Sequence, residues 1–346
     1  MKYRQLGNTD LNVSLICLGS MTWGEQNSER EAHQQLDFAV SEGVNFIDTA
    51  EMYPVPPNSS TCGRTETIIG NWLNRRNDRD KIIIASKVAA SSERMSHIRN
   101  GDIRLDRKNI EMAVVASLKR LQTDYIDLYQ THWPDRDSNY FGRLNYFHAP
   151  EKDNTAIEET LGVLEDLVRA GKIRHIGVSN ETPWGLSEHL RVSRENNWTR
   201  IVSIQNPYNL LNRTFEIGLS EFTQRERISL LAYSPTAMAT LSGKYLNNRQ
   251  PRGARLTLFP DYGRYKTRAA APAIKEYVAL AEAAGMDPIQ MSLAFVNSRP
   301  FVTSTIIGAT SMMQLKTNMD SINIELPGDV VRKLEKIHLK HPNPCP

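Results

Sequence analysis

Short apolar runs alternate with amphipathic segments along most of the chain. The runs are four to eight residues long, the length of buried strands, and polar or glycine-containing turns bound them. Between them, apolar residues recur at intervals of three and four, the spacing that gives a helix one apolar face. The pattern predicts eight strands, in chain order Ile16–Gly19, Val44–Asp48, Lys81–Lys87, Tyr125–His132, Ile173–Val178, Ile201–Gln205, Ile228–Tyr233 and Ser304–Ile307.

Helix start signals precede two of the amphipathic segments. Glu31 follows Ser28 by three residues, the spacing in which each side chain accepts a hydrogen bond from the other residue's backbone N–H. Thr155 and Glu158 have the same spacing and predict the start of a helix that runs to Ala170. A glycine follows each of these helices, and glycine readily adopts the left-handed conformation that ends a helix.

The order of these elements predicts the fold class. A turn at residues 7–10 separates Lys2–Leu6 from Leu11–Leu15 and predicts a β-hairpin before the first strand. Strands that alternate with helices indicate a parallel sheet, and eight repeats favour a closed (β/α)₈ barrel, the TIM barrel, over an open sheet. No G-x-G-x-x-G motif follows a strand, as a Rossmann fold would require. We therefore expect an α/β protein with one domain, residues 1–346.

Two long segments lack the pattern of either element. They are Trp133–Asp153 and Ser234–Arg268, and each follows a predicted strand. Loops of this length are often functional, and those that follow the strands of a barrel lie at its carboxyl-terminal face, where barrel enzymes have their active sites. We expect both to border the site. The last nine residues, HLKHPNPCP, are expected to be a frayed tail and not a metal site.

Composition narrows the class of partner. The net charge is only +3 and the basic residues are dispersed, which argues against nucleic acid or an anionic membrane surface as a partner. No apolar run approaches the roughly 18–20 residues that span a bilayer, and the N-terminus has no signal-peptide core. The three cysteines are scattered and have no metal-ligand spacing, which suits a cytoplasmic protein. Nothing in the sequence indicates a protein partner.

Ionisable residues end three successive predicted strands. These residues are Asp48, Lys87 and His132, and Tyr53 follows the first of the strands on a loop. A charged group at the end of a buried strand is costly unless it is paired or used in chemistry. Because adjacent strand ends lie about 5 Å apart, the side chains can converge on one pocket. The sequence therefore predicts an enzyme site at this rim.

These residue types suit the transfer of a proton to a carbonyl oxygen. The phenol of tyrosine has an ordinary pKa near 10, and a neighbouring ammonium such as that of Lys87 is expected to lower the pKa of Tyr53. Asp48 would hold Lys87 in place, and His132 would bind and orient the carbonyl oxygen. Since no side chain can donate a hydride, a reduction at this site needs a nicotinamide cofactor.

The same residues lie in motifs that resemble those of the aldo-keto reductase superfamily, including the branch of the potassium-channel β-subunits. The resemblance covers nearly the whole chain and implies a (β/α)₈ barrel that reduces an aldehyde or ketone with NADPH. It implies Tyr53 as the general acid, with Asp48, Lys87 and His132 completing a tetrad. Besides Lys87, the matching segments are VNFIDTAEMY (Val44–Tyr53), QTHWPD (Gln130–Asp135), RAGKIRHIGVSN (Arg169–Asn180), YSPTAMATLSGKY (Tyr233–Tyr245) and IIGATSMMQLKTN (Ile306–Asn318).

The resemblance also implies which residues contact the cofactor and substrate. Trp23 and Trp133 would form walls of the substrate pocket. Many family members carry a Lys and an Arg where this chain has Gly308 and Gln314, so the preference for NADPH over NADH would rest mainly on Lys244 and Arg255. The implied cofactor contacts are Met21, Asp48, Ser179, Asn180 and Gln205 near the nicotinamide, with Tyr233 stacked on its ring; Ser234, Pro235, Thr236, Ala237, Ser242, Gly243 and Lys244 at the pyrophosphate; and Arg255, Gly308, Thr310, Gln314 and Asn318 around the adenosine and its 2′-phosphate.

Two other functions remain open at this point. One is a nicotinamide-binding regulatory subunit with little turnover, as in the channel β-subunit branch, although a complete tetrad has little use without chemistry. The other is a barrel enzyme that acts on sugar phosphates without redox chemistry.

Overall fold

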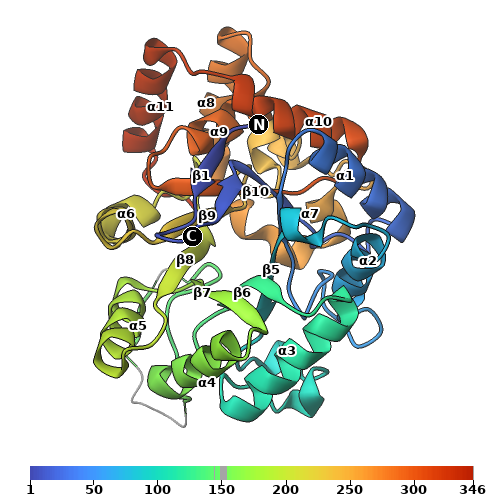
Figure 1. The fold of residues 1–346 in the computed structure, drawn as a ribbon. Helices are drawn as coiled ribbons and strands as arrows, with labels where there is room; N and C mark the ends of the chain where they lie inside the picture. The colour runs from blue at the N-terminus through green and yellow to red at the C-terminus, as the bar shows by residue number, and fades with distance from the viewer. Residues whose placement is uncertain (144, 149–153, 346) are drawn as a thin grey trace.

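Eight parallel strands form a closed barrel in the computed structural model, which describes residues 1–143, 145–148 and 154–345. The strands follow one another around the barrel in the order β10-β3-β4-β5-β6-β7-β8-β9. The predicted (β/α)₈ barrel is thus confirmed (Figure 1). The bounds are β3 Ile16–Gly19, β4 Phe46–Asp48, β5 Ile83–Val88, β6 Ile126–Thr131, β7 Ile173–Ser179, β8 Ile201–Pro207, β9 Ser229–Tyr233 and β10 Val302–Ile307.

The predicted hairpin closes the amino-terminal end of the barrel. β1 Tyr3–Gln5 pairs with β2 Asn12–Ser14 in an antiparallel sheet of two strands. Leu6 and Val13 join the apolar side chains that fill the barrel interior, among them Phe46 and Leu128. Because the interior is packed at this end, a polar site inside the barrel can open only toward the carboxyl-terminal rim.

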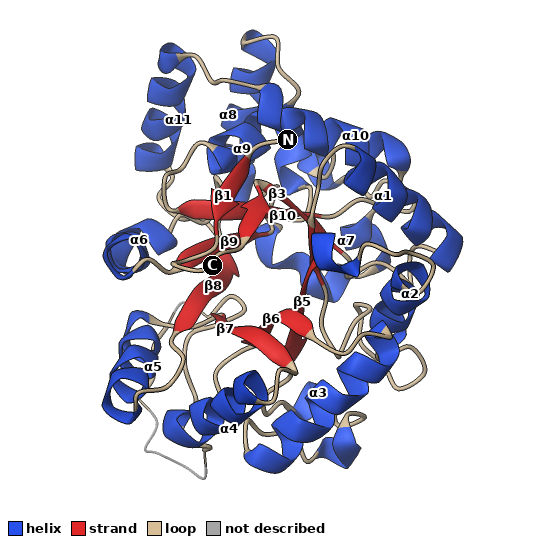
Figure 2. Cartoon of the chain, in the orientation of Figure 1, coloured by secondary structure: helices blue, strands red, loops and turns tan. Residues whose placement is uncertain are grey.

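Helices surround the barrel, as Figure 2 shows. The predicted Ser28–Glu31 capping box is present at the start of α1. The predicted cap at Thr155 is wrong: α4 begins at Ile157, so Ala156 is the N-cap and makes no side-chain cap bond. The helices are α1 Glu29–Ser41, α2 Arg64–Leu73, α3 Arg107–Leu121, α4 Ile157–Arg169, α5 Pro183–Asn196, α6 Phe215–Glu226, α7 Arg255–Leu258, α8 Ala270–Ala283, α9 Pro288–Asn297, α10 Met312–Asp320 and α11 Gly328–Lys340.

The two long loops differ from each other. The first, after β6, includes residues 144 and 149–153, which lie outside the described residues. The second, after β9, contains several short 3-10 turns and the single-turn helix α7, so it is more ordered than the sequence indicated. No helix in the described part of the chain has the length and apolar character needed to cross a bilayer.

The C-terminal tail is docked, so the prediction that it frays is wrong. The backbone N–H of Cys345 donates to the carbonyl of Leu211 over 3.1 Å, and the Cys345 side chain has no exposed surface. Asn343 Oδ1 accepts from the backbone N–H of Arg213 at 2.7 Å. Thr267, at the end of the second long loop, donates to the carbonyl of Pro344. The tail therefore connects the segment after β8 to the end of that loop.

Candidate active site

A buried ion pair lies at the carboxyl-terminal rim of the barrel. Lys87 Nζ donates to Asp48 Oδ2 at 2.7 Å and to the backbone carbonyl of Thr49 at 2.8 Å, and Lys87 has no exposed surface. Burial alone would lower the pKa of Lys87, but the carboxylate of Asp48 and the phenol of Tyr53 raise it above its ordinary value. The lysine is therefore held as an ammonium, with its charge fixed inside the rim.

Tyr53 faces this ammonium from the loop after β4. The Nζ atom of Lys87 lies 5.1 Å from the centroid of the Tyr53 ring. Burial raises the pKa of the phenol, and the opposing effect of Lys87 does not overcome it, so the expected net lowering is not observed. Tyr53 thus keeps its proton at neutral pH, and the ammonium beside it stabilises the anion left when the proton leaves.

His132 also contacts Tyr53 and comes one residue after the end of β6. The two ring centroids are 5.8 Å apart in an edge-to-face arrangement, and Trp133 packs on His132 at 4.9 Å. Burial and the charge of Lys87 hold the pKa of His132 well below its ordinary value, so the imidazole is neutral. Its buried Nδ1 atom finds no hydrogen-bond partner among the residues that the structure describes. The structure thus brings the four side chains that the sequence singled out together at one rim.

A hydrogen-bond network joins the tetrad to four residues that the resemblance assigned to the nicotinamide. Gln205 Nε2 donates to Asp48 Oδ1 at 2.8 Å, and the Ser179 hydroxyl donates to the Gln205 carbonyl at 2.8 Å. Asn180 Nδ2 donates to the carbonyl of His132 at 2.9 Å, while Asn180 Oδ1 accepts from the Tyr233 hydroxyl at 2.7 Å. These side chains are held in fixed positions beside the tetrad, as the binding of a planar amide requires.

Two residues of this network were missed in the sequence. The Gln130 side chain is buried and donates from Nε2 to Asp48 Oδ1 at 3.5 Å. The two-residue period of a strand could have found it, because Gln130 precedes His132 by two and pairs with Lys87 in the sheet. The guanidinium of Arg264 lies 5.4 Å from the Tyr233 ring centroid and donates to the Tyr265 hydroxyl. No local pattern marks an arginine in a long loop for such a position.

The segment after β9 carries two cations that suit a phosphate-bearing ligand. Its backbone has positive φ at Ser234, Ala237, Met238, Ala239 and Gly243, and Pro235 and Ala237 are buried. Within the described residues Lys244 forms no ion pair, and burial lowers its pKa.

The second cation is Arg255, whose Nε and Nη2 atoms are buried and find no hydrogen-bond partner in the described part of the chain. Burial lowers the pKa of Arg255, and the phenol groups of Tyr262, Tyr53 and Tyr245 partly oppose this effect. Two half-buried cations without an ion pair among the described residues suit a ligand that carries phosphates, so the residues present fit a dinucleotide.

Several polar groups of the segment Ile306–Asn318, which the resemblance assigns to the adenosine, form hydrogen bonds with one another. Gln314 Oε1 accepts from the backbone N–H and the hydroxyl of Thr310, and Asn318 Nδ2 donates to the Gly308 carbonyl. A Cβ atom placed on Gly308 would meet nothing within 4 Å. The segment is therefore shaped by hydrogen bonds within the protein, with open space beside Gly308.

The comparisons with known proteins agree with this geometry. The model of the aldo/keto reductase family matches residues 15–339. The chain belongs to the aldo/keto reductase family. It is 51% identical to Protein tas of Escherichia coli (strain K12) over 346 residues, which is the whole of both chains. It is 32% identical over 342 residues to the uncharacterized oxidoreductase YrpG of Bacillus subtilis (strain 168), covering 97% of this chain and 96% of that one.

A third relative is shorter. The aldo-keto reductase of Babesia bovis is 39% identical over 282 residues, which cover 76% of this chain and 98% of that protein. Family membership and these relatives make the chain an oxidoreductase enzyme of a family that generally uses NAD(P)H.

The structure buries both tryptophans that the resemblance assigned to the substrate pocket. Trp23 has no exposed surface, its indole N–H donates to Gln35 in α1, and its ring packs in the apolar core. Trp133 is 2% exposed and donates to the carbonyl of Ser91, while its ring contacts His132 and Phe141. Its contact with His132 makes it a support of the imidazole.

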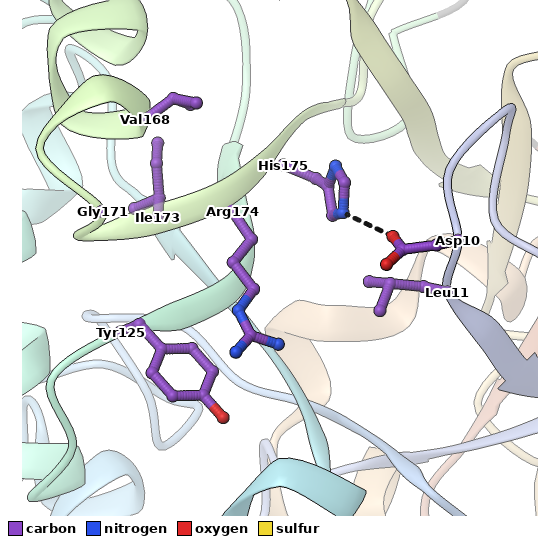
Figure 3. A pocket seen from close by; sticks show the side chains of 8 residues that line it. All are labelled: Asp10, Leu11, Tyr125, Val168, Gly171, Ile173, Arg174 and His175. Carbon is purple, nitrogen blue, oxygen red and sulfur yellow. Dashed lines mark ion pairs between the residues drawn. The ribbon is translucent and has the colours of Figure 1, made fainter.

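The aldo/keto reductase barrel also has a hollow of about 420 Å³ at its opposite end, shown in Figure 3. His175 Nε2 lies 3.7 Å from Asp10 Oδ1 in this hollow, and Arg174 stands beside the Tyr125 ring. The hairpin turn and the start of β7 line it, on the amino-terminal side of the barrel, away from the tetrad. Among the described residues, no group of three or more His, Cys, Asp or Glu could hold a metal ion.

Proposed function

We propose that this chain is an NADPH-dependent reductase that converts a small aldehyde or ketone to an alcohol, with Tyr53 as the general acid. The observation that supports it best is the rim itself, where a phenol, a paired ammonium and a neutral imidazole face one another. The cofactor, when bound, supplies the hydride. The protein's own residues supply the proton and bind the oxygen that receives it.

Tyr53 gives its proton to the carbonyl oxygen as that oxygen becomes an alkoxide. A phenol with a raised pKa still transfers its proton, because an alkoxide is a far stronger base than a phenolate. The fixed charge of Lys87 stabilises the phenolate that remains, and Asp48 keeps Lys87 charged and in place. Solvent then returns a proton to Tyr53.

His132 orients the substrate and does not act as an acid. A neutral imidazole can donate one hydrogen bond without contributing a charge that would compete with Lys87. Its position beside the Tyr53 ring lets both groups reach the same oxygen. Ser179, Asn180 and Gln205, which are held beside the tetrad by hydrogen bonds, would bind the amide of the nicotinamide.

The two cations of the second long loop would hold phosphates of the cofactor, and the preference for NADPH over NADH would rest on Arg255. Lys244 would contact the pyrophosphate and Arg255 the 2′-phosphate, which gives each cation the anion it lacks within the protein. Gly308 leaves open space at the adenine end and contributes no charge.

Steady-state oxidation of NADPH, followed with a panel of small aldehydes and ketones, tests the proposal. Titration of the protein with NADPH and with NADH, by quenching of intrinsic fluorescence, gives the two dissociation constants. Turnover with tighter binding of NADPH is the expected result. Tight NADPH binding without turnover on any carbonyl compound would contradict the reductase and favour a regulatory nicotinamide-binding subunit.

A further inference from the structure

A second buried ion pair lies directly behind the tetrad. The Glu51 carboxylate is 5% exposed and binds Arg99 through both oxygens, with Nη1 to Oε2 at 2.7 Å and Nη2 to Oε1 at 3.0 Å. Such bidentate pairs fix orientation as well as distance. Neither residue was singled out in the sequence.

Glu51 joins the loop of Tyr53 to the strand of Lys87. Its backbone N–H donates to the carbonyl of Lys87 at 3.1 Å, and its Oε1 atom accepts from the backbone N–H of Ala89 at 2.7 Å. One residue, Met52, separates Glu51 from Tyr53. A shift of Glu51 would therefore change the position of the phenol relative to the ammonium, now 5.1 Å from its ring centroid.

Arg99 is itself held from the start of α3. Its Nε atom donates to Asn109 Oδ1 at 2.7 Å, and Asn109 donates from its backbone and its side chain to Asp106, the N-cap residue of α3. Arg99 has a φ of 45°, in the left-handed region that a residue with a side chain rarely adopts. The contacts of its guanidinium on two sides hold it in this conformation.

We propose that Arg99, acting through Glu51, is a positioning residue that fixes Tyr53 against Lys87. Glu51 contacts the backbone of Lys87 and Ala89, and Arg99 acts on these residues through its ion pair with Glu51. Both are therefore assigned a positioning role, not a role in the transfer of the proton. Without the guanidinium, the buried carboxylate of Glu51 would lack its cation, and the loop that carries Tyr53 would move to bring it to water. This role rests on the proposed function of Tyr53 as general acid.

A matched control pair lies in the same wall of the barrel. The Glu66 carboxylate is fully buried, and Arg120 Nε donates to Glu66 Oε2 at 2.7 Å. This pair connects α3 to α2 and to the Ser86 hydroxyl, without the contacts to the backbone of Lys87 and Ala89 that Glu51 makes. Arg120→Ala therefore serves as the control for the loss of an arginine that is paired with a buried carboxylate.

The test compares Arg99→Ala, Glu51→Gln, the double variant and Arg120→Ala. For Arg99→Ala we expect kcat to fall by about tenfold to a hundredfold, as small displacements of catalytic groups do, with NADPH affinity changed less than about twofold. Because the two residues act as one unit, the double variant should be no slower than the slower single variant. Arg120→Ala should lose a similar amount of thermal stability and keep kcat within about twofold.

A second measurement does not depend on turnover. In protein labelled with ¹³C at the tyrosine ring, NMR titration gives the pKa of Tyr53, with the resonance assigned by Tyr53→Phe. Glu51→Gln, which preserves the shape of the side chain, should raise this pKa further because Lys87 no longer lies against the ring. An unchanged pKa, or a kcat loss in Arg99→Ala no larger than in Arg120→Ala, would overturn the positioning role. If the wild-type enzyme reduced no carbonyl compound, the proposed function would fail, while the NMR titration would still decide the positioning.

Discussion

Both ends of the barrel carry a cluster of charged side chains and aromatic rings. The two clusters differ in whether their buried polar atoms all have hydrogen-bond partners. At the amino-terminal end, the guanidinium groups of Arg79 and Arg174 lie 4.1 and 3.9 Å from the Tyr125 ring centroid. Asp127 accepts from both arginines, at 2.8 and 3.2 Å, and from the backbone N–H of Ile84 at 3.0 Å. The carboxylate of Asp127 is thus fully occupied by the protein itself.

The carboxyl-terminal rim is incomplete by comparison. Lys87 and Asp48 are paired, but within the described ranges His132 has one buried nitrogen without a partner, and Arg255 in the second long loop has two. A saturated cluster stabilises the fold, whereas an incomplete one indicates where a ligand binds. The hollow at the amino-terminal end is therefore a weaker indication of function than the unpaired atoms at the rim.

The largest effect is expected from Tyr53→Phe, which removes the proton donor alone. We expect kcat to fall by about a thousandfold, within the range for loss of general acid catalysis, because Tyr53 is the proposed proton donor among the described residues of the rim. NADPH affinity and the melting temperature should stay close to those of the wild-type protein. Single-turnover kinetics with NADPH measure this, and near-normal turnover would refute the acid role.

Lys87→Met should damage both activity and stability. It leaves Asp48 buried without its cation, and breaking a buried pair in this way costs about 3–5 kcal/mol. Urea unfolding gives the free energy, and the same samples give kcat. A variant that stayed as stable as the wild-type protein would show that Gln205 and Gln130 alone can hold the carboxylate.

Asp127→Ala is the matching change at the other end. It removes the acceptor shared by Arg79 and Arg174 and should cost about 2 kcal/mol of unfolding free energy, a value typical of hydrogen bonds to charged groups. Because this end takes no part in the chemistry, kcat should stay within about twofold of the wild-type value. A large loss of kcat at unchanged stability would break the contrast between the two ends.

Arg255→Ala should weaken NADPH by about tenfold, the equivalent of one charge-assisted hydrogen bond, and NADH much less. Fluorescence titration with each cofactor measures the two dissociation constants. Equal weakening of both would remove the 2′-phosphate from the proposed contacts of Arg255 and favour the pyrophosphate.

The smallest effect concerns pH. The pKa of His132 is lower in the folded protein than in the unfolded chain, so below about pH 6.5 the unfolded state binds the additional proton. Stability should therefore fall as the pH is lowered from about 6.5 toward the folded pKa, by at most about 1.4 kcal/mol per pH unit for this group. Urea unfolding of the wild-type protein and of His132→Gln checks this: the variant should show a shallower pH dependence between pH 5 and 7.

Much of the fold and the centre of the site could be predicted from the sequence. Strand period and helix spacing located all eight barrel strands, because each βα unit buries its apolar face locally. Asp48, Lys87 and His132 could be grouped because parallel strands bring their carboxyl ends to one rim. The grouping of these three residues follows from the order of strands and helices, and the local sequence pattern already predicts that order.

Features that depend on distant packing could not be predicted. Trp23 lies next to a strand end, yet its indole is buried against α1 through Gln35. The positions of Arg99 and Arg264 depend on contacts with residues far along the chain, and both are in loops without periodicity. The direction of the Tyr53 pKa shift depends on whether burial or the charge of Lys87 has the larger effect. That balance follows from the folded structure and not from the sequence pattern.

Because the C-terminal tail is docked, the reactivity of the Cys345 thiol depends on whether the tail is bound. Burial raises the pKa of Cys345 to about 11, and no part of its side chain meets solvent while the tail is bound. An alkylating reagent could reach this sulfur only after the last residues detach from Leu211 and Thr267. Labelling kinetics of the unmodified protein would therefore time the detachment, and saturating cofactor would slow the labelling if the second long loop and the tail move as one.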